Sequence, residues 1–359
     1  MTITNVITRP ANRMKKTDRT FGVEIEFGLK RDITEATFKS EFEMRTGEEI
    51  VMSTGHYNTP VNSRKWTLAY DGSVRVRNHY GRELKSPPIK LSEIHRIKKV
   101  YDYLNEVGKV NRTCGHHVHI DCNDMNFKQW KKVLIAYLVN EDVIDMMHPI
   151  SRRFGSGVGT QYCGSGQGRR HISVNRSEHS TTYNILQEHY KSVVINECIK
   201  KIKKSRNIRQ LVSSGFGDKY SNVCFKENFG TIEFRQHAGT LEHGKVMNWI
   251  TFLNQFVIAY GFGPAVARKD ETRNNGRDRL FFRKVSQLFK STQNRMKTYG
   301  GFDIDGSEES INFLGKRISH FIRKLTGDSH YERAMRLILE ERGVRFNLRG
   351  GNNENNNEQ

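Results

Sequence analysis

Residues 21–30 read FGVEIEFGLK, with apolar and charged side chains in alternation. Because successive side chains of a strand point to opposite faces, this alternation predicts a β-strand with one buried face. The large apolar residues fall on one side, and Glu24 and Glu26 fall on the other. The segment therefore predicts a sheet that covers a core with one face and presents carboxylates on the other.

Two later segments show the same alternation with other ionisable groups. The residues that share a face are His117, His119 and Asp121 in the first segment and Glu233, Arg235 and His237 in the second. One interpretation is three amphipathic strands with solvated outer faces. Such faces favour Lys and Thr beside Glu, whereas these hold the pairs Glu-Glu and His-His, and neighbouring like charges repel unless a cation or another partner compensates. We therefore predict one functional site built from all three strands.

Carboxylates joined by one or two imidazoles suit Mg²⁺ or Mn²⁺ better than structural zinc. Zinc is an alternative because Cys114, His116 and Cys122 flank the paired histidines. On a regular strand, however, these three residues fall on the face opposite His117 and His119, so such a site would require a broken strand.

The remaining elements mix strands and helices without regular βαβ alternation, which predicts an α+β fold with a largely antiparallel sheet. Strands are expected at 21–30, 64–77, 81–89, 111–122, 171–175 and 229–241, with turns at Asp71-Gly72 and His79–Gly81. Helices are expected at 33–45, 91–108, 126–147, 183–212 and 245–260.

The chain has 359 residues, a hydrophobic fraction of 36% and a formal net charge of +20. This charge favours anionic partners, such as nucleotides, polycarboxylates, anionic lipid or nucleic acid, without choosing among them. The five cysteines are odd in number and scattered, and no secretory signal precedes them. No apolar run approaches the roughly 18 residues of a membrane helix. We expect a cytoplasmic protein without disulfides.

Residues 151–170 form a Gly-rich segment bracketed by arginines. It is either a flexible surface loop or a mobile lid that carries Arg152, Arg153 and Arg170 to phosphate or carboxylate oxygens.

Five motifs occur in an order that resembles the amidoligase family: GVEIEF, DGS, ELKSPP, CGHHVH and TIEFRQHAGTL. Members of this family are ATP-dependent carboxylate–amine ligases related to glutamine synthetase and glutamate–cysteine ligase. The resemblance spans roughly residues 21–260. It implies a curved antiparallel sheet of the glutamine synthetase type, with helices packed on one face and divalent cations and ATP on the concave face.

The resemblance also implies roles for individual residues. The implied metal ligands are Glu24, Glu26, Glu83, His117 and Glu233, with Asp71 as a further candidate. His119 resembles the histidine near the nucleotide phosphates, and Arg235 the arginine that steadies the transferring phosphoryl group. Glu26, Glu233 and Arg235 would take part in catalysis. The role of His116, which precedes the metal-binding histidine, is left open.

Outside the amidoligase-like catalytic domain (20–262), the composition predicts a flexible basic arm (1–19), a linker (263–278), a small basic helical segment (279–345) and a disordered tail (346–359). The implied reaction uses ATP and Mg²⁺, or Mn²⁺, to join an acid to an amine through an acyl phosphate. Neither substrate nor the oligomeric state follows from the sequence.

Two other interpretations stay open. The segment from His117 to Asp121 resembles part of the histidine motif of metallo-β-lactamase-type hydrolases, although Cys122 stands where that motif has another histidine. The chain is alternatively a nucleic-acid-binding or structural protein on an inactive ligase-like scaffold, using its basic run at 200–209.

Overall fold

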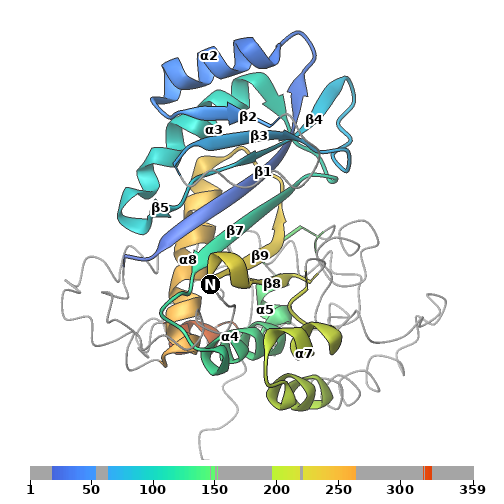
Figure 1. Ribbon diagram of the computed structural model, residues 1–359, viewed down its shortest axis with the longest axis vertical. Coiled ribbons are helices and arrows are strands. Elements are labelled where there is room, and N and C mark those ends of the chain that lie inside the picture. The colour runs from blue at the N-terminus through green and yellow to red at the C-terminus, as the bar shows by residue number, and fades with distance from the viewer. Residues whose placement is uncertain are drawn as a thin grey trace, which may run out of the picture.

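The computed structural model describes residues 18–53, 64–145, 147–149, 152, 196–218, 221–263, 318 and 320–325. In this part of the chain, one open nine-stranded sheet forms the centre of the molecule (Figure 1). Every strand pairing is antiparallel except that between β2 and β3. The predicted mixed fold with a largely antiparallel sheet is thereby confirmed.

The strand order is β2-β3-β4-β1-β7-β9-β8, and the short strands β5 and β6 pair with β1. Strand bounds are β1 (Thr20–Lys30), β2 (Ile50–Met52), β3 (Trp66–Tyr70), β4 (His79–Lys85), β5 (Ile89–Lys90), β6 (Gly108–Lys109), β7 (Gly115–Asp121), β8 (Val223–Lys226) and β9 (Thr231–Ala238). Strand β1, the segment with the alternating pattern, lies between β4 and β7 and so connects the two halves of the sheet.

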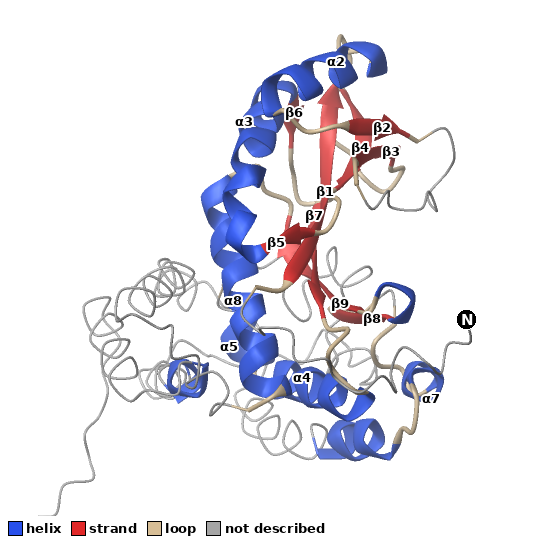
Figure 2. Ribbon diagram, turned by 60° about the vertical axis from the view of Figure 1, so that its left-hand side comes forward, coloured by secondary structure: helices blue, strands red, loops and turns tan. Residues whose placement is uncertain are grey.

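The helices are α2 (Glu35–Thr46), α3 (Ile97–Val107), α4 (Phe127–Val139), α5 (Glu141–Asp145), α7 (Ile208–Ser213) and α8 (His243–Gly261), with 3₁₀ turns η1 (Leu91–Arg96) and η3 (Glu227–Phe229). Helices α3 and α8 lie along one side of the sheet, whereas α4 lies at its lower end and α7 at the lower right, away from α8 (Figure 2). Residues 196–204 are also helical. The expected helix at 126–147 is interrupted at Asn140, whose side chain donates to the Ala136 carbonyl.

Local sequence explains where several helices begin and end. Thr34 accepts a hydrogen bond from the Thr37 amide and starts α2, which ends at Gly47 with φ +74°. A left-handed residue of this kind is most readily supplied by glycine. Asn126 and Gln129 form a capping box at the start of α4, so two amides at the helix terminus are satisfied.

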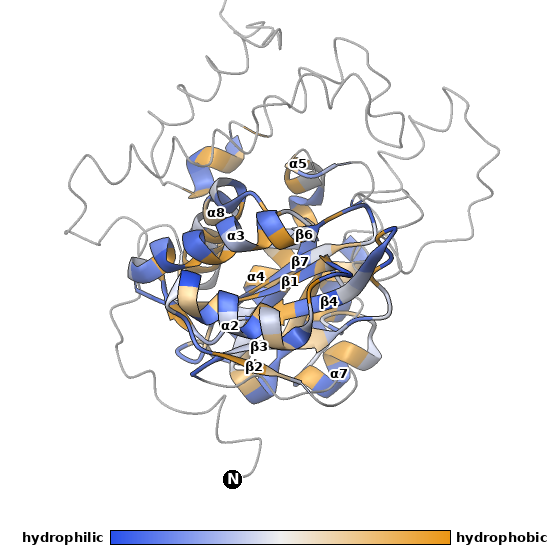
Figure 3. Cartoon of the chain, turned by 90° about the horizontal axis from the view of Figure 1, so that it is seen from above, coloured by the Kyte–Doolittle hydropathy of each residue, from blue (hydrophilic) through white to orange (hydrophobic). Residues whose placement is uncertain are grey.

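The core lies between the sheet and the helices. Ile25 and Phe27 of β1, Val118 of β7 and Phe234 of β9 are buried there. Helix α8 packs against α3, α4 and β7. Seen from above, α2 carries both hydrophilic and hydrophobic residues (Figure 3), and its buried residues are Phe38, Phe42 and Thr46. Helix α8 is buried on most sides, since every residue from 252 to 259 is buried. The core therefore anchors one face of β1, β7 and β9 and leaves Glu24, Glu26, His117 and Glu233 on the other.

Two stretches of strand differ from the sequence expectation. Residues 73–77 form no strand, and β4 begins at His79, inside the expected turn. Instead, Val74 and Val76 pack with Cys114 in a small separate cluster. The loop approaches β1 so closely that a Cβ on Gly28 would lie 2.6 Å from the Cβ of Val76. Strands β2 and β8 were not predicted because each is only a few residues long. The expected strand at 171–175 and the first part of the helix expected at 183–212 lie outside the described residues.

Residues before β1 and after α8 pack against the domain that contains the sheet. Arg19 is buried, forms a 2.6 Å ion pair with Asp124, and stacks over the ring of Phe262. Residues 318 and 320–325 are helical, and the Leu325 carbonyl accepts a hydrogen bond from Gln255. The rest of the expected C-terminal helical segment, the linker and the tail lie outside the described residues.

The described cysteines, Cys114, Cys122, Cys198 and Cys224, are buried free thiols. Cys163 lies outside the described part of the chain. Among the helices that the structure describes, none combines the length and the apolar character that crossing a bilayer requires.

Candidate active site

The registers of three strand pairs bring the predicted residues together. Glu24 of β1 lies opposite His117 of β7, and His119 lies opposite Glu233 of β9. On the other side of β1, Glu26 lies opposite Glu83 of β4. Residues directly opposite each other in an antiparallel pair share a face. Five predicted metal ligands and His119 therefore meet on the face of the sheet that does not cover the core.

The first donor group consists of Glu24, His117 and Glu233, whose ligand atoms all lie within 4.8 Å of one another. The Nδ1 atom of His117 is 3.2 Å from Oε2 of Glu24 and 3.6 Å from Oε1 of Glu233. His119 adds its Nε2 atom 3.3 Å from the other Glu24 oxygen. Because all of these donors come from strands, their geometry is set by the sheet itself.

The second donor group consists of Glu26, Glu83 and His117, also within 4.8 Å. Here the other ring nitrogen of His117, Nε2, lies 3.5 Å from Oε1 of Glu26. The second Glu26 oxygen accepts a 2.5 Å hydrogen bond from the Gly115 amide. A Cβ at Gly115 would lie 2.9 Å from Nε2 of His117, so the close approach of backbone and ligands requires glycine. His117 thus joins the two groups through its two ring nitrogens.

The carboxylates of the site have different pKa values: that of Glu83 is raised, whereas those of Glu24 and Glu233 are lowered. Burial raises the pKa of Glu83 to about 8, and the charges of Glu24 and Glu26 add to the effect against the opposing charge of Lys85. Burial also acts to raise the pKa of Glu24, but hydrogen bonds with His117 and His119 outweigh it and hold the pKa well below its usual value. For Glu233, burial is outweighed chiefly by Arg235 and His119, and its pKa is lowered to about 2.

Three cationic side chains surround these carboxylates. The Lys85 ammonium group is 2.9 Å from Glu83, and that of Lys226 is 2.9 Å from Glu233. Arg235 also forms an ion pair with Glu233. Neither lysine is among the site residues predicted from the sequence. Lys85 belongs to the ELKSPP motif and is two residues from Glu83 on the same face, a usable signal; Lys226 ends the unpredicted strand β8.

This donor set fits divalent cations. Several carboxylates are held together in a largely buried place, where burial and then their mutual repulsion raise the pKa of Glu83. Oxygen donors with one imidazole match the preferences of Mg²⁺ and Mn²⁺. Among the described residues, no group of Cys and His side chains has metal-ligand spacing, so the zinc alternative finds no support there.

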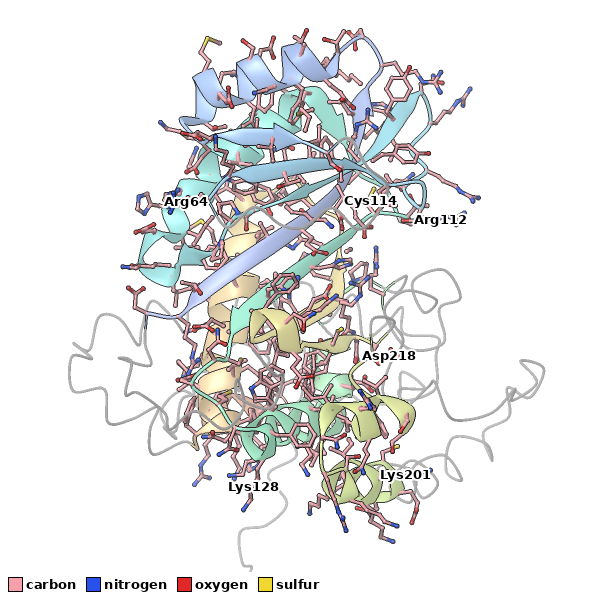
Figure 4. The ribbon with its side chains drawn as sticks, viewed as in Figure 1. Arg64, Arg112, Cys114, Lys128, Lys201 and Asp218 are labelled. Atoms are coloured by element: carbon pink, nitrogen blue, oxygen red, sulfur yellow. The ribbon has the colours of Figure 1, made fainter. Side chains whose placement is uncertain are left out.

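Arg152 lies beside the second donor group. Its guanidinium group donates to the carbonyl of Cys114, and a Cβ on Gly115 would lie 3.4 Å from it. Cys114 directly precedes β7 and is labelled in Figure 4. One of the three arginines expected in a lid is thus close to the site. Arg153 and Arg170 lie outside the described residues.

Two further carboxylates considered in the sequence accept hydrogen bonds from nearby residues. Asp71 accepts hydrogen bonds from the amide and hydroxyl of Ser73 in a turn. Asp121 accepts from the amide and side chain of Asn123. Neither is part of the two donor groups that the described residues form.

His237 is on the opposite face from that expected, because β9 contains a β-bulge. Arg235 and Gln236 together face the single residue His117, between the pairs Val118–Phe234 and His116–His237. An extra residue reverses the alternation beyond it. The His237 ring therefore packs in the core, 5.8 Å from the ring of His116 and 5.6 Å from that of Trp249. His116 is fully buried and contacts the Tyr101 hydroxyl, which places it on the core side as well.

Comparison with known proteins agrees with this arrangement. A family model described as "Putative amidoligase enzyme" matches residues 17–257. This span includes every strand of the sheet and all residues of both donor groups. A search of curated proteins finds no match. Since the matched span is well over half of the sequence, the chain belongs to the amidoligase family.

Proposed function

We propose that the chain is an ATP-dependent carboxylate–amine ligase that uses Mg²⁺, or Mn²⁺, and forms an amide through an acyl phosphate. The observation that carries the proposal is the pair of carboxylate donor groups that share His117, with cationic side chains around them. Membership of the amidoligase family supports the same reaction type.

The chemistry follows from the low reactivity of a carboxylate as an acyl donor. Transfer of the terminal phosphoryl group of ATP to the substrate carboxylate gives an acyl phosphate and ADP. The amine then attacks the acyl carbon, the C–N bond forms, the bond to the phosphate oxygen breaks, and the amine loses a proton. Bound divalent cations would neutralise the charge that develops on the phosphate oxygens.

The side chains of this site suit that sequence of steps. Glu24, Glu26, Glu83, Glu233 and His117 would hold the cations. Arg235 is bound to Glu233 and is 15% exposed, so it would exchange that partner for the transferring phosphoryl group. His119, whose Nδ1 lies 3.1 Å from the Thr231 hydroxyl, would bind phosphate oxygens, and Arg152, Arg153 and Arg170 would supply further cationic contacts. Rigid positioning of charges by strands provides most of the catalysis in such reactions.

The test is a screen of acid and amine pairs for release of ADP and phosphate in the presence of Mg²⁺. We expect one pair to stimulate release and to yield an amide detectable by mass spectrometry. Glu24→Ala and Glu233→Ala should abolish turnover, whereas Glu242→Ala, at an exposed residue that pairs with Lys245, should retain it. Turnover that survives both site substitutions would contradict the assignment.

The hydrolase interpretation makes a different prediction: tightly bound zinc and turnover without a nucleotide. The contacts of Asp121 with Asn123 do not favour it. Metal analysis of the purified protein separates the two interpretations.

A further inference from the structure

The two lysines of the site come from opposite sides of the carboxylates. Lys85 lies on β4, opposite Glu24, and Lys226 ends β8 on the far side of β9. Their side chains are only 11% and 28% exposed. A lysine removed from water to this extent needs an anionic partner in every state of the protein, because an uncompensated buried charge is strongly unfavourable.

Both lysines contact carboxylates of the same cluster. Lys85 lies directly opposite Glu24 across β1 and β4 and forms an ion pair with Glu83. Lys226 forms an ion pair with Glu233, which belongs to the same donor group as Glu24. Residues on both sides of Glu24 therefore bring an ammonium group to the donor groups.

The oxygens that bind the lysines belong to the proposed metal ligands. Glu83 is in the second donor group and Glu233 in the first. When all four are ionised, as metal binding requires, Glu83, Glu233, Glu24 and Glu26 supply four negative charges, against three positive charges from Lys85, Lys226 and Arg235. A single divalent cation would make the total positive. Glu83 and Glu233 would then be shared with the cation, and the partly buried lysines would need another anion.

We propose that Lys85 and Lys226 are anion-binding residues, which pair with Glu83 and Glu233 until cations bind those carboxylates and then bind the oxygens of an anionic ligand. The inference rests on the proposed function and specifies its ligand chemistry: the metal-loaded site takes an oxyanion, a phosphate or a carboxylate group. It makes metal and anion binding mutually dependent, since each supplies the charge that the other requires.

The test measures binding rather than turnover, on the full chain. Mn²⁺ is titrated into the wild type, Lys85→Met and Lys226→Met, and tripolyphosphate or glutarate is then titrated into each Mn²⁺-loaded protein by calorimetry. Lys98→Met is the matched control, because Lys98 forms an ion pair with Asp102 on an exposed helix face. Lys85→Arg and Lys226→Arg retain the charge, and thermal melting verifies that every variant is folded.

Removing either lysine should tighten Mn²⁺ binding by about fivefold or more, because a cation that competes for the same oxygens is gone. The same variants should bind the anion about tenfold more weakly, the magnitude of one lost charge-assisted contact. The arginine variants should restore anion binding, and Lys98→Met should change neither affinity. A larger loss for tripolyphosphate identifies nucleotide phosphate as the ligand, and a larger loss for glutarate identifies the substrate carboxylate.

Unchanged Mn²⁺ and anion affinities in both methionine variants would overturn the inference, as would a wild type that binds no Mn²⁺. If the affinities shift as expected but no acid is ever joined to an amine, the proposed reaction is wrong and the anion site stands. If ligation occurs and the lysine variants bind metal and anion like the wild type, the inference alone fails.

Discussion

At the scale of single residues, His117 has the most demanding position in the site. One of its ring nitrogens faces Glu24 and Glu233 and the other faces Glu26. The residue is buried, and the neighbouring backbone at Gly115 leaves no room for a side chain beside it. Small changes in this place should therefore alter metal binding more than they alter the fold.

Gly115→Ala tests that expectation. The new methyl group would lie 2.9 Å from Nε2 of His117 and 3.1 Å from Oε2 of Glu26, so one of these donors must move. We expect Mn²⁺ affinity to fall by about tenfold, since metal sites require donors in a defined geometry. Gly22→Ala is the control. Gly22 lies on β1 opposite His119, and a Cβ there would lie an ordinary 3.7 Å from its nearest neighbours. Equal Mn²⁺ affinities of the two variants would contradict the prediction.

Glu83 gives a prediction on pH. Its pKa is about 8, against an ordinary value of 4.5, so between these values the folded chain holds a proton that the unfolded chain has lost. The contribution of Glu83 to stability is therefore present at low pH and is lost as the pH rises towards 8.

Urea unfolding of the wild type and Glu83→Gln, at pH 5 and pH 8 with a chelator present, measures this contribution. From pH 5 to pH 8, the unfolding free energy of the wild type should fall relative to that of Glu83→Gln. Glu242→Gln, at an exposed position, should show no such change. A difference between wild type and Glu83→Gln that is the same at both pH values would show that Glu83 is not buried among like charges.

At the scale of elements, the β-bulge in β9 decides which side chains reach the site. It keeps Arg235 beside Glu233 and turns His237 into the core. Gln236, within the bulge, is buried and accepts a 2.6 Å hydrogen bond from the Tyr137 hydroxyl of α4. Helix α4 thus contacts the bulge of β9 through this hydrogen bond.

Tyr137→Phe removes that support. The side-chain oxygen of Gln236 would lose the Tyr137 donor in the core, so we expect a loss of about 1–3 kcal/mol in the free energy of unfolding. Tyr103→Phe is the matched control, because the Tyr103 hydroxyl makes only longer contacts of 3.3 and 3.4 Å. Urea unfolding of both variants measures the difference. A loss no larger for Tyr137→Phe than for Tyr103→Phe would show that the bond to Gln236 contributes little.

The regular strands were predictable from the sequence, whereas the bulge in β9 and the short strand β8 were not. Alternation in β1 and β7 correctly assigned Glu24, Glu26, His117 and His119 to one face, because regular strands obey a period of two. It failed for His237, since a bulge has no clear local signal and reverses the period. Strand β8, with Lys226, was missed because four residues are too few for a pattern.

Tertiary context explains the other differences. Residues 73–77 alternate like a strand, but Val74 and Val76 pack against Cys114 and Val110 instead of joining the sheet. No local pattern distinguishes these two ways of burying valine. Lys85 lies two residues from Glu83 on one strand, so its ion pair could have been predicted, whereas that of Lys226 depends on strand β8, which no local pattern predicted.

At the scale of the whole molecule, the layered fold separates two functions. The helices and the buried face of the sheet provide stability, while the opposite face carries the two donor groups. The excess positive charge of +20 is partly gathered elsewhere. Lys128 of α4 and Lys201 lie at the same end of the molecule (Figure 4), where Lys131 donates to the carbonyls of Lys203 and Ser205. Such a charge would attract ATP and an acidic substrate towards the protein before the site selects them.

The central claim is that two carboxylate groups bind divalent cations through one shared histidine, and the stoichiometry of Mn²⁺ binding tests it most directly. The wild type should bind two ions per chain, Glu24→Gln and Glu83→Gln should each lose one, and His117→Ala, if folded by thermal melting, should lose both. A wild type that binds no Mn²⁺, or a folded His117→Ala variant that still binds two ions, would contradict the account.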